Sequence, residues 1–358
     1  MNYSGNITSL PAISISPFGL TCFEHRLSSS YKRNSKDVYI GSNVSDDSET
    51  KELTKYNFDE YKSKDEHEEL SLHSIKRIKN ALGWLYFVAQ PQRKYNSSIK
   101  KWVKFKLTFI TLTLPSKQIH SDREIKSNAL NHFLTLLRKR NNNINYIWRA
   151  EKQENGNIHF HIVADKYIDF AVLRSLWNRS INRLGYVDRY TEHMRNNCNS
   201  FESYCSMYQK RESMKTMKDR YARGMATNWT SPNSTDIHGL SKIKNVLNYI
   251  TKYLTKAHKH NTKNKKGISN NQSIDGRMWG LSESLSKCRN VVILIDSEVS
   301  KDLKEIFAKV KSYEYKDDYF FYKCCTLYDY VRLNLNTLLN HIKEHLKTCF
   351  NEVELGFF

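Results

Sequence analysis

The sequence contains no apolar run that approaches the ~18 residues needed for a membrane-spanning helix. Its first residues also lack a basic segment followed by a sustained apolar stretch, so we predict no secretory signal. The seven cysteines are scattered without a C-x-x-C pair, and an odd number does not suit a disulfide framework. These absences argue against a membrane protein, a secreted protein and a zinc finger, and they favour a reducing cytoplasm.

Basic residues are abundant. The chain of 358 residues has 57 Lys and Arg against 37 Asp and Glu, a formal net charge of +20, and 12% of its residues are aromatic. This charge favours a polyanionic partner, above all nucleic acid. Aromatic side chains would stack on bases, although a hydrophobic core would use them as well.

The composition divides the chain into three parts. Residues 1–75 have few apolar residues and include an acidic stretch, and we expect a flexible segment. This segment is either a solvated tail or a cover over a nucleic-acid-binding face. Residues 76–290 have the periodicity of a globular domain, and residues 291–358 form a small C-terminal α/β extension of unknown role. Because strands and helices mix and at least one hairpin is antiparallel, we predict an α+β fold.

Apolar periodicity places the secondary structure. Predicted strands cover 102–114, 146–152, 158–164, 186–190 and 290–295, and predicted helices cover 122–140, 170–184, 201–226, 242–258 and 327–350. Asn155-Gly156 indicates a hairpin between the second and third strands. Cap residues over 234–236 are expected shortly before the 242–258 helix.

The predicted hairpin carries the sharpest chemical signal. His159 and His161 are two residues apart on one strand, so both imidazoles project from the same face. A three-residue loop would place Glu151 opposite His159, whereas a register shifted by one residue would leave Glu154 or Gln153 as the third ligand. Such a set has open positions for a substrate. The alternative is a pair of solvent-facing histidines on a half-buried strand.

A second pattern lies in the 242–258 helix. Tyr249 and Tyr253 are one turn apart on one helix face, and Lys252 and Lys256 have the same spacing one step round. A phenol with its ordinary pKa of ~10 is a poor nucleophile at neutral pH unless a cation stabilises the phenolate. Alternatively, the tyrosines pack on the sheet while the lysines face water.

Together, the histidine strand and the later Tyr-x-x-Lys-Tyr helix resemble the HUH endonucleases, specifically two-tyrosine initiators of rolling-circle replication. The strand 109–115 is similar to the first of three family motifs, and the motif order is that of replication initiators rather than conjugative relaxases. The stretches 233–238 and 276–280 resemble initiators of small bacterial plasmids and single-stranded DNA phages. The resemblance covers about residues 102–285.

This resemblance implies a central five-stranded antiparallel sheet flanked by helices, with a bound Mg²⁺ or Mn²⁺. By position, it implies His159, His161 and Glu151 as metal ligands, Tyr249 and Tyr253 as first and second nucleophiles, and Lys252 as a helper lysine. By ligand chemistry alone, two imidazoles and a carboxylate would also suit zinc. Candidate nucleic-acid contacts are Lys256, Arg277, Trp279 and His238, against the alternatives of a solvated basic face, a packed Trp and a helix-capping neighbour.

The implied activity is nicking of single-stranded origin DNA in a bacterial host cytoplasm. The tyrosine would form a 5′-phosphotyrosine link, free a 3′-hydroxyl primer for a host DNA polymerase, and later rejoin the ends. The sequence lacks a Gly-x-x-x-x-Gly-Lys-Ser/Thr loop, so unwinding would need a host helicase. The alternatives are a single-strand transposase of the same superfamily and a non-catalytic basic nucleic-acid-binding protein. Neither the origin sequence nor the oligomeric state follows from these residues.

Overall fold

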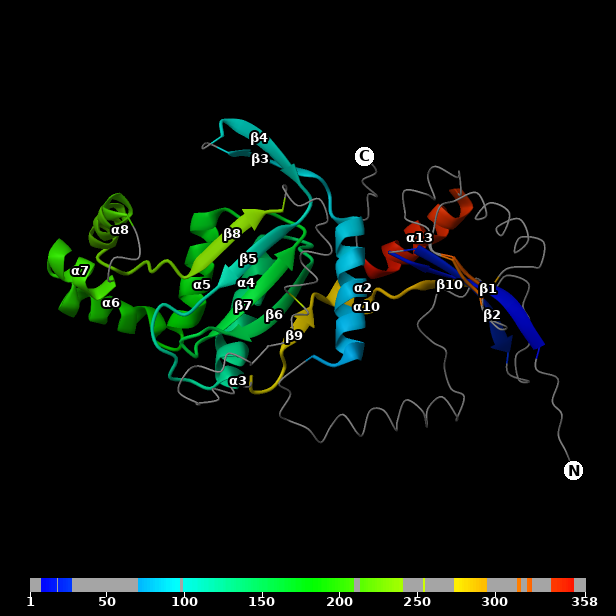
Figure 1. Ribbon diagram of the computed structural model, residues 1–358, viewed down its shortest axis with the longest axis horizontal. Coiled ribbons are helices and arrows are strands. Elements are labelled where there is room, and N and C mark those ends of the chain that lie inside the picture. Colours follow the sequence, from blue (N-terminus) through cyan, green and yellow to red (C-terminus); the bar gives the residue numbers. More distant parts are fainter. Residues whose placement is uncertain are drawn as a thin grey trace, which may run out of the picture. The chain divides into compact units, whose positions relative to one another are not determined.

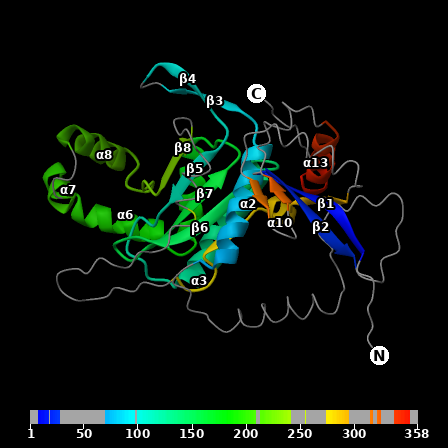
Figure 2. The ribbon, with the colours of Figure 1, turned by 45° about the vertical axis from the view of Figure 1, so that its right-hand side comes forward.

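The computed structural model describes ten parts of the chain, which are residues 8–17, 19–27, 70–96, 99–208, 213–240, 254, 274–294, 314–316, 321–323 and 336–350. They fall into two compact units (Figures 1 and 2). The larger unit is formed by residues within 62–78 and 89–282, and the smaller by residues within 1–61, 79–88 and 283–358. None of the described helices is both long enough and apolar enough to cross a membrane.

A five-stranded antiparallel sheet with the strand order β8-β5-β7-β6-β9 forms the centre of the larger unit (Figure 1). Its strands are β5 (Thr108–Leu112), β6 (Tyr146–Lys152), β7 (Ile158–Ala164), β8 (Thr235–Gly239) and β9 (Trp279–Leu281). Together with the helices described below, this sheet confirms the predicted α+β class and the predicted strand number.

The predicted hairpin has the predicted bounds. β6 and β7 pair through Lys152 and Ile158, and the loop between them is closed by a hydrogen bond from the Gly156 amide to the Gln153 carbonyl. Gly156 has a φ of 82°, in the left-handed region that three-residue hairpin loops place at this position. The loop length fixes the register of the whole strand pair.

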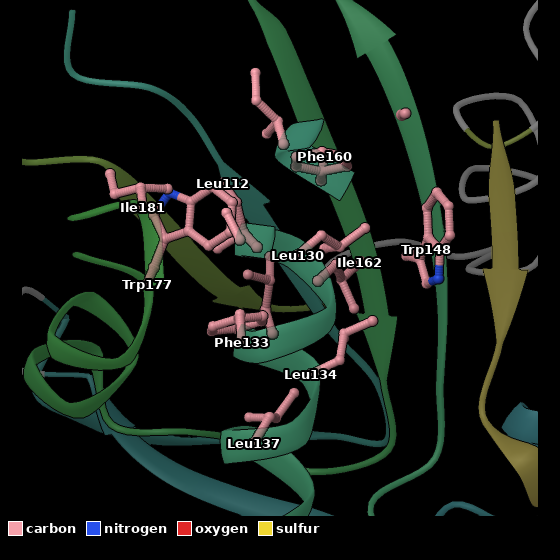
Figure 3. Packing of buried hydrophobic residues seen from close by; sticks show 14 of the residues in the cluster. Leu112, Leu130, Phe133, Leu134, Leu137, Trp148, Phe160, Ile162, Trp177 and Ile181 are labelled. Atoms are coloured by element: carbon pink, nitrogen blue, oxygen red, sulfur yellow. The ribbon is translucent and has the colours of Figure 1, made fainter. Parts of the chain in front are cut away.

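Alternation along the strands gives the sheet one apolar face. Ile110 of β5, Ala150 of β6 and Phe160 of β7 are fully buried on it. Figure 3 shows side chains of two helical segments packed against this face. The first comprises α3 (Asp122–Glu124), the π-helical turn η1 (Ile125–Leu130) and α4 (Asn131–Arg140), and the second is α5 (Phe170–Asn182). A capping box between Ser121 and Glu124 begins the first segment.

Three further helices follow α5, and here two predictions are wrong. The expected strand 186–190 is the start of α6 (Tyr186–Asn197). Gly185, with a φ of 73°, reverses the chain after α5, and the buried positions Tyr186, Val187, Thr191 and Met194 then recur at helical spacing. The single helix expected over 201–226 is two helices, α7 (Phe201–Tyr208) and α8 (Met214–Ala226), and the Ser213 side chain caps α8.

The strand predicted over 102–114 is also divided. Its first part is β4 (Lys101–Phe105), which pairs with β3 (Gln92–Asn96) in a separate hairpin, and its second part is β5. Between them, the Leu107 side chain is buried and its carbonyl accepts from the Leu240 amide after β8. Alternation alone does not reveal this change of sheet, because both parts keep a period of two.

The smaller unit contains a three-stranded sheet of order β10-β1-β2, formed by β10 (Val291–Leu294), β1 (Thr8–Ser16) and β2 (Gly19–Leu27). Residues 8–27 therefore differ from the flexible segment expected there, whereas β10 confirms the strand expected over 290–295. Further elements are α10 (Glu283–Lys287), β11 (Glu314–Lys316), β12 (Phe321–Lys323), α13 (Asn336–Cys349) and part of α2 (Leu72–Val88). α13 lies within the helix predicted over 327–350, of which 327–335 are outside the described residues.

Candidate metal centre

Three metal-ligating side chains meet on the face of the sheet opposite the core. Glu151 lies directly across from His159 in the register of β6 and β7, as the three-residue loop predicts. Glu151 Oε2 is 3.5 Å from His159 Nε2 and 3.4 Å from His161 Nε2. One ligand atom from each residue lies within 4.8 Å of the others. The shifted register with Glu154 or Gln153 as the third ligand does not occur.

The neighbouring strand β5 supports His161 from the side. Thr111 is opposite His161 in the register, and its Oγ1 is 3.3 Å from His161 Nδ1. A neutral imidazole that donates from Nδ1 to this hydroxyl keeps its Nε2 lone pair directed toward Glu151. The Phe109 ring, with its centroid 5.1 Å from that of His161, packs beside it. The imidazole is therefore held on two sides.

Arg149 is a residue of this site that the sequence analysis missed. Its side chain is only 1% exposed, and its Nε is 3.5 Å from Glu151 Oε1. Burial raises the pKa of Glu151, but hydrogen bonds from His159 and His161 and the charges of His161 and Arg149 outweigh it, so the pKa lies well below its ordinary value. The carboxylate is therefore ionised. The available signal was position, because a charged residue two before Glu151 must share its face of the strand.

This donor set fits a divalent cation. Two imidazole nitrogens and one ionised carboxylate are common ligands of such ions, and three protein ligands leave positions open for substrate oxygens. The partly buried side chains Glu151, His159 and His161 would hold the ion. They come from adjacent strands of a well-packed sheet, so their spacing is set by backbone pairing rather than by a loop.

The other predicted contacts with nucleic acid lie on both sides of this cluster. His238 belongs to β8, which replaces the expected cap over 234–236, and its Nδ1 is 3.5 Å from Asp236 Oδ2. Its ring packs against Phe109, the same ring that contacts His161. Trp279 of β9 is opposite Arg149, and the exposed Arg277 donates from Nε to the Trp279 carbonyl at 2.8 Å. Tyr249, Lys252, Tyr253 and Lys256 lie outside the described residues.

The β3–β4 hairpin is basic and carries exposed aromatic residues. Tyr95 and Trp102 are a cross-strand pair with ring centroids 5.7 Å apart, and they are 48% and 68% exposed. From Gln92 to Phe105 the sequence contains Arg93, Lys94, Lys100, Lys101 and Lys104 but no acidic residue. Exposed rings surrounded by cations are the elements of a stacking surface for single-stranded nucleic acid.

A cavity of about 460 Å³ lies beside α6, α7 and α8. Arg174, Arg220 and Arg223 line it together with aromatic side chains, and no acidic residue is among the described residues that line it. The Nε of Arg174 is buried and has no hydrogen-bond partner among the described residues. Concentrated positive charge with an unused donor suits a phosphate group.

The fold and the His-His-Glu cluster thus define a mixed α/β protein with a candidate divalent-metal site on an antiparallel sheet. Residues 107–258 match a family model of replication-associated proteins, the ORF2 family. This segment begins just before β5 and contains Glu151, His159 and His161, and it supports a replication initiator family. Comparison with curated proteins and with solved structures gave no significant match.

Proposed function

We propose that this protein is a replication initiator that nicks single-stranded origin DNA through a tyrosine and rejoins the ends in rolling-circle replication. The observation that carries the proposal is the convergence of Glu151, His159 and His161 on one face of a sheet. The match of residues 107–258 to a replication-associated family supports the same activity. A binding protein without catalysis would not need ionised and neutral ligands held in this register.

The chemistry is a transesterification. A divalent cation bound by Glu151, His159 and His161 would withdraw charge from the scissile phosphate. The Tyr249 oxygen attacks phosphorus after losing its proton, the bond from phosphorus to the 3′ oxygen breaks, and that oxygen takes up a proton. Lys252 favours the phenolate by its positive charge. The free 3′-hydroxyl primes a host polymerase, with a host helicase unwinding the duplex.

Rejoining uses the same chemistry in reverse. After one round of copying, Tyr253 would cut the regenerated junction and become linked to its 5′ end. The new 3′-hydroxyl then attacks the first phosphotyrosine, which restores the phosphodiester and releases Tyr249. Because each link conserves the energy of the bond it replaces, no nucleotide cofactor is needed for closure.

The proposal is tested by looking for the covalent link. The full-length protein is incubated with Mn²⁺ and a pool of single-stranded oligonucleotides tiled across the replicon that encodes it, followed by denaturing electrophoresis. We expect a slower protein band that a nuclease trims and a chelator prevents. Tyr249→Phe combined with Tyr253→Phe should abolish that band and leave DNA binding largely intact, because phenylalanine keeps the ring and removes the nucleophile.

Tyr221→Phe, on α8, serves as the matched control and should keep the band. A band that persists in the double variant would rule out both phenols as nucleophiles. Binding without any covalent band across the whole pool would favour the non-catalytic alternative, in which the basic surfaces perform the entire function.

We further propose that the β3–β4 hairpin holds the DNA strand by stacking, with the arginine-lined cavity as a phosphate contact. Trp102→Ala should weaken binding of a labelled single-stranded oligonucleotide by about 1–3 kcal/mol, roughly five- to 150-fold, because the exposed indole loses its stacked base. Fluorescence anisotropy without divalent cation measures this step apart from cleavage. Ile119→Ala, which removes another exposed apolar side chain, should have little effect. Equal affinity of the Trp102→Ala variant and the unchanged protein would contradict the stacking role.

A further inference from the structure

A second group of metal-ligating side chains lies in the smaller unit. Cys288 follows α10, while His345 and Cys349 are four residues apart near the end of α13, a spacing that places them on one helix face. One ligand atom from each of the three residues lies within 4.8 Å of the others. The proposed DNA chemistry uses none of them.

The imidazole of His345 has the hydrogen bonding of a metal ligand. The residue is 3% exposed, and its Nε2 is 3.0 Å from the Arg289 carbonyl, which can only accept, so Nε2 carries the proton. In a neutral ring Nδ1 then has a free lone pair. This atom is buried and has no hydrogen-bond partner among the described residues. An unsatisfied buried polar atom costs about 1–3 kcal/mol, which a bound metal would offset.

The two thiols complete a ligand set of soft character. Cys288 is 4% exposed, Cys349 is partly exposed, and both are free cysteines. Lys287 and Arg289 flank Cys288, and their charges favour the thiolate form that binds metals. Two thiolates and one imidazole select zinc over the hard cations magnesium and calcium. Zinc ligands lie roughly 3.5–3.8 Å apart on a tetrahedron with bonds of about 2.0–2.3 Å, so the three side chains need only a small closure.

We propose that Cys288, His345 and Cys349 bind a zinc ion, with water in the fourth position beside the partly exposed Cys349. The ion joins the end of α13 to the chain that leads into β10, and so stabilises a unit with a small core. The sequence analysis argued against zinc because the cysteines form no C-x-x-C pair. The ligands instead come from residues about 60 positions apart, which only the folded chain brings together.

The test separates this site from the His-His-Glu cluster. The full-length untagged protein with His159→Ala and His161→Ala is purified, and its zinc is measured by mass spectrometry. We expect one zinc ion per chain, lost when Cys349→Ser is added and kept with Cys205→Ser, which changes another partly buried free cysteine. Replacing zinc by Co²⁺ should produce a sulfur-to-cobalt charge-transfer band, which imidazole and carboxylate ligands cannot give.

A second measurement remains valid if Cys349→Ser disturbs folding. In the protein without cysteine substitutions, alkylation of Cys288 and Cys349 should be slow with zinc and fast after treatment with a chelator, while alkylation of Cys205 stays unchanged. Absence of zinc and of the charge-transfer band, chelator-independent alkylation, or a Cys288–Cys349 disulfide in anaerobically purified protein would overturn the proposal. None of these readouts depends on DNA cleavage, so the result is independent of the proposed function.

Discussion

Glu151→Gln is expected to slow formation of the covalent protein–DNA link by more than about a hundredfold, because changes to residues that only support a metal ligand already cost ~10–100-fold. The amide removes the charge that two imidazoles and Arg149 surround. Arg149, which is almost fully buried, would then lose its ionised partner. The measurement is the single-turnover rate of covalent attachment as a function of Mn²⁺ concentration.

Glu154→Gln provides a matched control for this substitution. Glu154 lies in the loop of the same hairpin and would be the ligand only in the shifted register, so its substitution should leave the rate within about twofold. A normal rate for Glu151→Gln at all Mn²⁺ concentrations would remove Glu151 from the site. A large loss with Glu154→Gln instead would mean that the strand register differs in the active protein.

Local sequence signals were sufficient for the hairpin that carries the candidate site. The bounds of β6 and β7 agree with the alternation of apolar residues, and Asn155-Gly156 determines the loop and thereby the register. The pairing of Glu151 with His159 could therefore be predicted without any tertiary information. The metal, the nucleophilic tyrosines and the DNA contacts remain proposals, because they depend on family resemblance and on residues outside the described parts.

Features that depend on distant parts of the chain could not be predicted. β1 pairs with β10 across more than 270 residues, and nothing in the composition of either strand identifies the other. The start of α6 alternates like a strand over five residues, and only its next turns reveal the helix. Arg149 is recognisable as part of the site only when its burial is known, and the Cys288, His345 and Cys349 group only when α10 and α13 are folded.

One strand serves the candidate site and the core at the same time. Between His159 and His161, Phe160 points to the opposite face of β7, where it is fully buried. Its ring centroid is 6.3 Å from that of Trp148 and 6.0 Å from that of Trp177, and both contacts are edge-to-face (Figure 3). The position of the two imidazoles is therefore coupled to the packing beneath them.

Phe160→Ala should lower the free energy of unfolding by about 3–5 kcal/mol, because it removes a ring from a site where α4 and α5 cannot close the cavity completely. This is a large part of the ~5–15 kcal/mol that stabilises a typical domain. Urea unfolding followed by tryptophan fluorescence measures the loss, since Trp148 and Trp177 border the cavity. Phe160→Leu keeps most of the apolar volume, so it should cost less and, where the protein is folded, retain the rate of covalent attachment. An unchanged midpoint for Phe160→Ala would contradict the buried position of this ring, and with it the face assignment that directs His159 and His161 toward Glu151.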